Sequence, residues 1–143
     1  METTNTPPKS FKIIAILAVL WNLIGVASYL MNAYMPDDVF EALPENQQEF
    51  MNNTPAWATA AFAIAVFAGF IASIGLLMKK KWCIPLFLLS FLAAIAQNIN
   101  GFVLSNGMEV YGPTGLILPI LVIAICIYLI YYSRKANANG WLS

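Results

Sequence analysis

Two largely apolar segments contain amide and hydroxyl side chains, seven of which limit the chemistry that this chain could perform. Amides and hydroxyls donate and accept hydrogen bonds but do not ionise near neutral pH. They can recognise a neutral ligand, or join helices, without reacting themselves. We identify as a candidate polar cleft Asn22, Ser28, Tyr29, Asn32, Gln97, Asn98 and Asn100.

Two interpretations of this polar set stay open. An amide in hydrocarbon must find a partner, and hydrogen bonds between membrane helices contribute about 0.6–2 kcal/mol each. The side chains could therefore serve only to join helices. Alternatively, they line an uncharged cleft that binds a hydroxylated or amide-bearing solute, since Gln97, Asn98 and Asn100 fall within four residues.

Acid–base and nucleophilic catalysis lack the groups that they need. The chain has no histidine, the commonest general base and metal ligand. Without a histidine, or a lysine inside an apolar segment, nothing activates a serine or threonine. Cys83 and Cys126 form no C-x-x-C pair, and we expect both to be small buried residues without a disulfide. The sequence predicts a protein that is not an enzyme and that has no metal site and no cofactor.

An acidic cluster in residues 36–54 is a candidate for binding a cation. Carboxylates bind Ca²⁺ when a loop spaces them regularly, but Pro44 breaks the helical register between Glu41 and Glu45. We interpret the cluster as a solvated acidic face. Its members are Asp37, Asp38, Glu41, Glu45 and Glu49.

A stripe of small residues predicts where one helix packs closely against another. Its members recur at every fourth position, which places them on one helix face. Apolar helices in lipid associate through van der Waals packing, and small residues let their backbones approach. The stripe predicts packing within the monomer or, alternatively, a seam between copies of the chain. This helix-packing seam consists of Ala61, Ala65, Gly69 and Ser73.

Four apolar segments must position all these residues. The chain has 143 residues, 60% hydrophobic and 10% charged, whereas a soluble domain carries about 25% charged residues. Each segment reaches the ~20 residues that cross a bilayer. We predict an all-α fold and a single transmembrane domain over residues 1–143, an antiparallel four-helix bundle with spans over about residues 12–35, 55–78, 82–104 and 113–133.

Prolines and capping residues predict how these helices begin and end. Thr54 and Pro55 are favoured as N-cap and first helical residue of the second span. Pro119 lies inside the fourth span and should kink the helix or loosen its outer turn. Between the first two spans, residues 36–54 should form short amphipathic helices on the outer membrane interface.

Charge segregation predicts the orientation. Basic residues occur near the N-terminus, in one mid-chain turn and in the C-terminal tail, whereas most acids lie in the other two loops. Cytoplasmic loops are rich in Lys and Arg, so both termini should be cytoplasmic. The same segregation argues against nucleic acid as a partner. The basic residues are Lys9, Lys12, Lys79, Lys80, Lys81, Arg134 and Lys135.

Trp21 lies deeper than an interfacial tryptophan. It follows Lys12 by about nine residues, which is ~14 Å along a helix. Interfacial tryptophans sit at the level of the lipid headgroups, so we assign Trp21 to the core or to a partner surface.

Several short sequences together resemble a family of small four-span bacterial membrane proteins loosely labelled "sugar transporter". They are Trp21–Gly25, Thr54–Trp57, Phe62–Phe67, Tyr111–Pro113 and Gly140–Ser143. The resemblance covers nearly the whole chain and implies a location in the bacterial inner membrane. It carries over no catalytic or binding residues, although an amide-rich cleft is compatible with the label.

Two functional hypotheses follow. The first is a non-enzymatic inner-membrane protein that acts through helix–helix association, as a homo-oligomer or as an accessory subunit, with membrane lipids and itself or another membrane protein as partners. The alternative is an oligomeric binder or passive transporter of a small neutral solute such as a sugar. A lipid-binding or membrane-shaping protein is a third class. Ion-coupled transport is disfavoured because no ionisable acid or base lies within a span.

Overall fold

The computed structural model describes residues 7–104 and 107–143, and residues 1–6 and 105–106 of the predicted 1–143 domain lie outside this described part. Within these ranges all regular structure is helical, which confirms the all-α prediction. The elements are α1 (Lys9–Ala33), α2 (Asp37–Glu41), α3 (Glu45–Asn52), α4 (Ala56–Leu77), α5 (Cys83–Ile99), the π-helix η1 (Asn100–Leu104), α6 (Gly107–Tyr111), the 3₁₀ helix η2 (Pro113–Leu116) and α7 (Ile117–Ala138).

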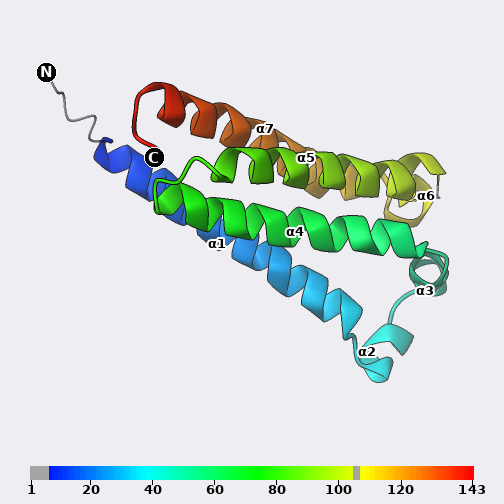
Figure 1. The fold of residues 1–143 in the computed structure, drawn as a ribbon. Helices are drawn as coiled ribbons and strands as arrows, with labels where there is room; N and C mark the ends of the chain where they lie inside the picture. The colour runs from blue at the N-terminus through cyan, green and yellow to red at the C-terminus, as the bar shows by residue number, and fades with distance from the viewer. Residues whose placement is uncertain (1–6, 105–106) are drawn as a thin grey trace, which may run out of the picture.

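Four helical stretches of the described residues are long and apolar enough to cross a membrane, namely Lys9–Ala33, Ala56–Leu77, Cys83–Leu104 and Pro113–Ala138. Successive stretches run in opposite directions (Figure 1). The last one continues to Ala138 instead of ending near residue 133. Its additional turn is held in place because Ala136 is completely buried.

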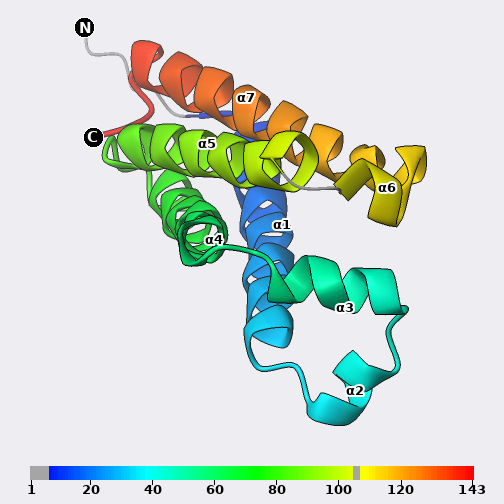
Figure 2. The same ribbon diagram turned by 90° about the vertical axis from the view of Figure 1, so that its right-hand side faces the viewer.

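Helix α4 is central to the arrangement. It packs against α1 and against α5, and α5 in turn packs against α7. Helices α1 and α7 lie close together at one end of the molecule and diverge toward the other (Figures 1 and 2). We name the end where they meet the basic end, because it carries the lysines of α1 and of the α4–α5 turn. The opposite end, with α2, α3 and α6, is the acidic end.

The largest cluster of buried apolar residues lies at the basic end. Phe11 of α1 is only 2% exposed and stacks on Tyr132 of α7, with ring centroids 6.1 Å apart. It also meets Trp141 of the C-terminal tail edge-on at 5.7 Å. The tail folds back to hydrogen-bond the backbone of the α4–α5 turn. Other members of the cluster are Ala15, Ala18, Ala72, Leu76, Cys83, Phe87, Leu129, Ala136 and Leu142.

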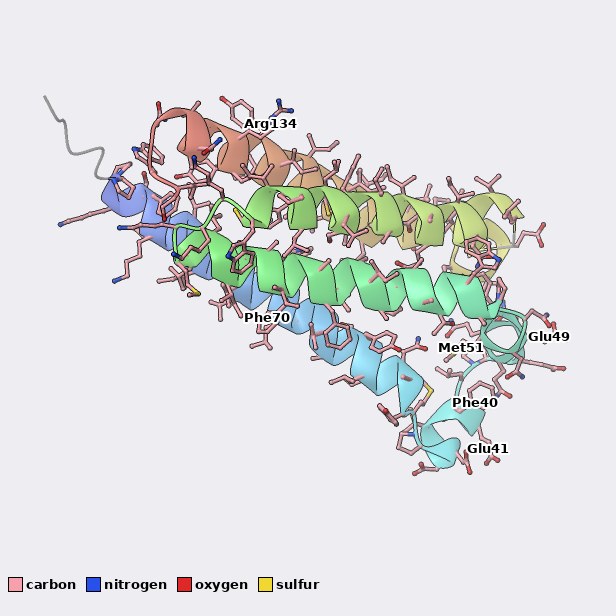
Figure 3. All side chains as sticks on the ribbon, in the orientation of Figure 1. Phe40, Glu41, Glu49, Met51, Phe70 and Arg134 are labelled. Carbon is pink, nitrogen blue, oxygen red and sulfur yellow. The ribbon has the colours of Figure 1, made fainter. Side chains whose placement is uncertain are left out.

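Short helices cover the acidic end, in agreement with the two short helices predicted in residues 36–54. Figure 3 shows Glu41 and Glu49 there, with Arg134 at the opposite end of the molecule. Phe50 of α3 meets Tyr111 of α6 edge-on at 5.4 Å. Partial burial raises the pKa of the Tyr111 phenol above its ordinary value. The loop between α1 and α4 is thus attached to the segment that precedes α7.

One prediction about helix ends needs correction. Helix α4 begins at Ala56 with Pro55 as its N-cap, and the Thr54 hydroxyl donates instead to the Phe50 carbonyl, 2.9 Å away, at the end of α3. Pro119 lies in the first turn of α7, where a proline is tolerated. The outer turn before it is wound as the 3₁₀ helix η2, in agreement with the expectation that this turn departs from a regular α-helix.

Replacing Phe11 with Ala should destabilise the basic end, because the ring packs against both α7 and the C-terminal tail. Truncation of a buried phenylalanine costs about 3–5 kcal/mol, and we expect a loss of this order in the free energy of unfolding in detergent. Ile13→Ala is the matched control on the same helix, since Ile13 is 58% exposed. Equal losses for the two variants would contradict this placement of the core.

Candidate functional site

Three helices meet at Gly69 of α4. A Cβ added to this glycine would overlap Oδ1 of Asn22 from α1 and lie 3.0 Å from Oγ of Ser90 from α5. Both neighbouring helices therefore approach the α4 backbone as closely as a glycine permits. All four residues of the helix-packing seam are buried inside the chain, which favours the interpretation of packing within the monomer: Ala61, Ala65, Gly69 and Ser73.

Hydrogen bonds join the helices around this contact. The Asn22 amide donates to Ser73 Oγ at 2.8 Å and to the backbone of its own helix at 2.8 Å. Ser73 Oγ donates to the backbone one turn earlier in α4, at 2.7 Å. Ser90 Oγ donates to the Ala65 carbonyl at 2.6 Å, which joins α5 to α4. Asn22 therefore joins two helices, which is the first of the two roles that the sequence suggested for the polar residues.

A cavity of about 250 Å³ lies beside this contact, with walls from all four long helices. Small residues leave the space, among them Gly25, Ala65 and Ala94. Four of the seven predicted cleft residues line the cavity, and they come from α1 and α5: Asn22, Ser28, Gln97 and Asn98. The structure therefore brings together polar side chains from two helices that are far apart in sequence.

Three predicted cleft residues lie outside the cavity wall. The Tyr29 ring turns toward α4, where it meets Phe62 and Phe67 edge-on with centroid distances of 5.3 and 5.8 Å. Asn32 is exposed near the end of α1. Asn100 is buried, but it begins the π-helix η1, whose wider turn changes the direction of the side chains after α5.

The sequence prediction missed the contribution of α7. Pro119, Val122 and Cys126 line the cavity, and their spacing of three and four residues puts them on one face. That spacing was the only signal, because no amide marks this helix. Cys126 is half-buried and Cys83 buried, and both are free thiols.

Internal hydrogen bonds use part of the donors in the cavity wall and leave the side-chain oxygens as acceptors for a ligand. Asn98 Nδ2 donates to the Ala94 carbonyl at 2.8 Å, and Ser28 Oγ donates to the Ile24 carbonyl at 2.9 Å. As with Asn22 and Ser90, the oxygen of each side chain keeps free lone pairs. Gln97 differs, because its side chain makes no hydrogen bond to any residue that the structure describes.

The lining of the cavity contains no charged side chain. In residues 7–104 and 107–143 no group of three His, Cys, Asp or Glu side chains lies close enough together to hold a metal ion. The cavity is therefore suited to hydrogen bonding with a neutral molecule.

Comparisons with protein-family models, with curated proteins and with solved structures each gave no match. The resemblance to small four-span "sugar transporter" proteins stays a prediction.

Replacing Gly69 with Ala should disrupt the three-helix contact, because the added methyl group overlaps Asn22 and crowds Ser90. Overpacking of this kind costs about 1–3 kcal/mol, to be measured as loss of unfolding free energy in detergent. Gly101→Ala is the matched control, since the nearest atom to its added Cβ would be Phe50 Cζ at 3.8 Å. A Gly69→Ala variant as stable as the control would contradict the close approach.

Proposed function

We propose that this chain is a multi-pass protein of a bacterial inner membrane and that its cavity binds a small neutral ligand without chemical conversion. The observation that carries this proposal is the Gln97 amide, half-buried in the wall of an uncharged cavity between four apolar helices. Its amide atoms are accessible, since no fully buried side-chain N or O atom of the described residues lacks a partner. In the proposed membrane setting, an amide left without a hydrogen-bond partner costs free energy. A ligand that forms hydrogen bonds with Gln97 would offset this cost.

The free atoms of the cavity wall favour a ligand rich in hydroxyl groups. Asn22 and Ser28 use all their donors inside the chain and Asn98 uses one of its two, so all three offer oxygen lone pairs to a hydroxyl donor. Gln97 can both donate and accept. Ligand pockets typically measure about 300–1,000 Å³, so a cavity of about 250 Å³ suits a small molecule. A sugar or another small polyol has this chemistry.

Binding or passive passage fits this wall better than catalysis or ion coupling does. The lining residues include no acid, no lysine and no histidine, and proton- or ion-coupled transporters usually carry such groups within the membrane. An ion in the cavity would lose its hydration without gaining an opposite charge.

Association with a second copy or with another membrane protein is the second candidate function. The most apolar windows of the first and last long helical stretches are only 11% and 6% buried. The seam residues are enclosed inside the chain, so an assembly would have to use the exposed faces of α1 and α7. The mass of the purified protein in nanodiscs distinguishes a monomer from an assembly.

The proposed orientation places both termini in the cytoplasm. After replacement of Cys83 and Cys126 with Ala, a single cysteine can report each end of the molecule. We expect a membrane-impermeant maleimide to label Glu49→Cys in intact spheroplasts, because Glu49 is exposed at the acidic end. Ser143→Cys, at the basic end, should react only after lysis. The reverse pattern would overturn the orientation.

Replacing Gln97 with Leu should abolish binding. The leucine side chain is of similar size, but it lacks the amide that would form hydrogen bonds with the ligand. A solute that binds only the native state raises the unfolding midpoint, by an amount that grows with the ratio of its concentration to its Kd. The matched control is Asn32→Leu, which removes an exposed amide outside the cavity. We would screen monosaccharides, inositol and glycerol against the unmutated protein and against these two variants. If no solute of this screen stabilises the unmutated protein, the cavity does not bind a water-soluble polyol.

A further inference from the structure

An apolar groove of about 420 Å³ adjoins the cavity. It lies between α1 and α7, where Leu17 and Tyr128 form part of its walls. Trp21 and Ile24 line both the groove and the cavity. The two hollows are therefore neighbours along α1, and the deep tryptophan stands where they meet.

The groove opens sideways between the two diverging helices. Leu17 is 59% exposed and Ile24 62% exposed on α1, and Tyr128 is 46% exposed on α7. From Ile14 to Ile24 the groove follows α1 for ~15 Å, from the level of the cavity toward the basic end. In the proposed membrane setting this side of the molecule faces the hydrocarbon of the bilayer.

The two hollows differ in chemistry. The amides and serine hydroxyls belong to the cavity, among them Gln97 and Asn98. The groove is formed by aliphatic side chains together with the rings of Trp21 and Tyr128. Neither hollow is lined by a charged residue, so a phosphate headgroup would be buried without a counter-charge. A ligand with a neutral hydroxylated head for the cavity and a hydrocarbon tail for the groove would match the chemistry of the two hollows.

We propose that the ligand of the cavity is a neutral single-tailed amphiphile that enters from the bilayer between α1 and α7. Its hydroxylated head hydrogen-bonds to Gln97, and its tail lies in the groove against Trp21 and Leu17. This inference rests on the proposed function, because it assigns a class of ligand to the same cavity. It adds a tail site and a route of access that a water-soluble polyol does not require.

Monolaurin and glycerol form a probe pair that separates the head from the tail. We expect monolaurin to raise the unfolding midpoint of the protein in phosphatidylcholine nanodiscs, and to bind at least about tenfold more tightly than glycerol. Leu17→Trp should fill the groove and lower monolaurin affinity by about tenfold. Ile13→Trp is the matched control, because Ile13 is 58% exposed on the same helix but lies outside the groove.

A second measurement needs no substitution in the groove. A monoacylglycerol with a photoreactive diazirine in its tail is incorporated into liposomes with the unmutated protein, and labelled peptides are identified by mass spectrometry. We expect labelling concentrated on the α1 segment around Leu17 and the α7 segment around Tyr128. Equal labelling of exposed side chains on all four long helices would mean ordinary annular lipid and would overturn the tail site.

The outcomes separate this inference from the proposed function. If glycerol or a sugar stabilises the protein as well as monolaurin does, or if Leu17→Trp binds monolaurin unchanged, the cavity binds a ligand but the tail site is wrong. If monolaurin stabilises Gln97→Leu as strongly as the unmutated protein, the tail binds without the cavity amide and the role of Gln97 fails. If neither monolaurin nor any soluble probe stabilises the protein, both proposals fail.

Discussion

The close approach of three helices at Gly69 is the contact on which the rest of the structure depends. Apolar helices gain little by exchanging lipid contacts for contacts with one another, so their association requires close packing and a few hydrogen bonds. Helix α4 provides both through Gly69 and Ser73, with Asn22 arriving from α1 and Ser90 from α5. Residues of larger volume on this face would separate the helices.

The cavity is a consequence of the same contact. Three helices are held together at Gly69, while the small residues next to it, Gly25, Ala65 and Ala94, do not fill the space toward α7. Joining the helices also consumes donors, because the amide of Asn22 and the hydroxyl of Ser90 both point to partners inside the chain. The polar groups that stabilise the fold therefore determine which atoms remain for a ligand. In the proposed function, structural joining and ligand binding, first considered as alternatives, are both roles of one polar set.

The divergence of α1 from α7 gives this small protein a side opening. The aromatic contacts of Phe11 hold the two helices together at the basic end, and α4 packs against α5 beside the cavity. In a bilayer, such an arrangement offers a polar interior that is reached through hydrocarbon rather than through water. Trp21, which its depth assigned to the core or to a partner surface, lies at the junction of these two environments.

The sequence by itself determined the number and approximate length of the long helices, because a run of about 20 apolar residues can satisfy its backbone only within a helix. It also determined the packing face of α4, since a spacing of four residues fixes a face within a single helix. It did not determine which polar side chains meet. Asn22 and Tyr29 share an arc of α1, yet only Asn22 reaches the cavity, because Phe62 and Phe67 hold the Tyr29 ring elsewhere. The contribution of α7 and the groove beside Trp21 were decided by the tertiary structure alone, since both depend on how side chains from distant segments set the angle between helices.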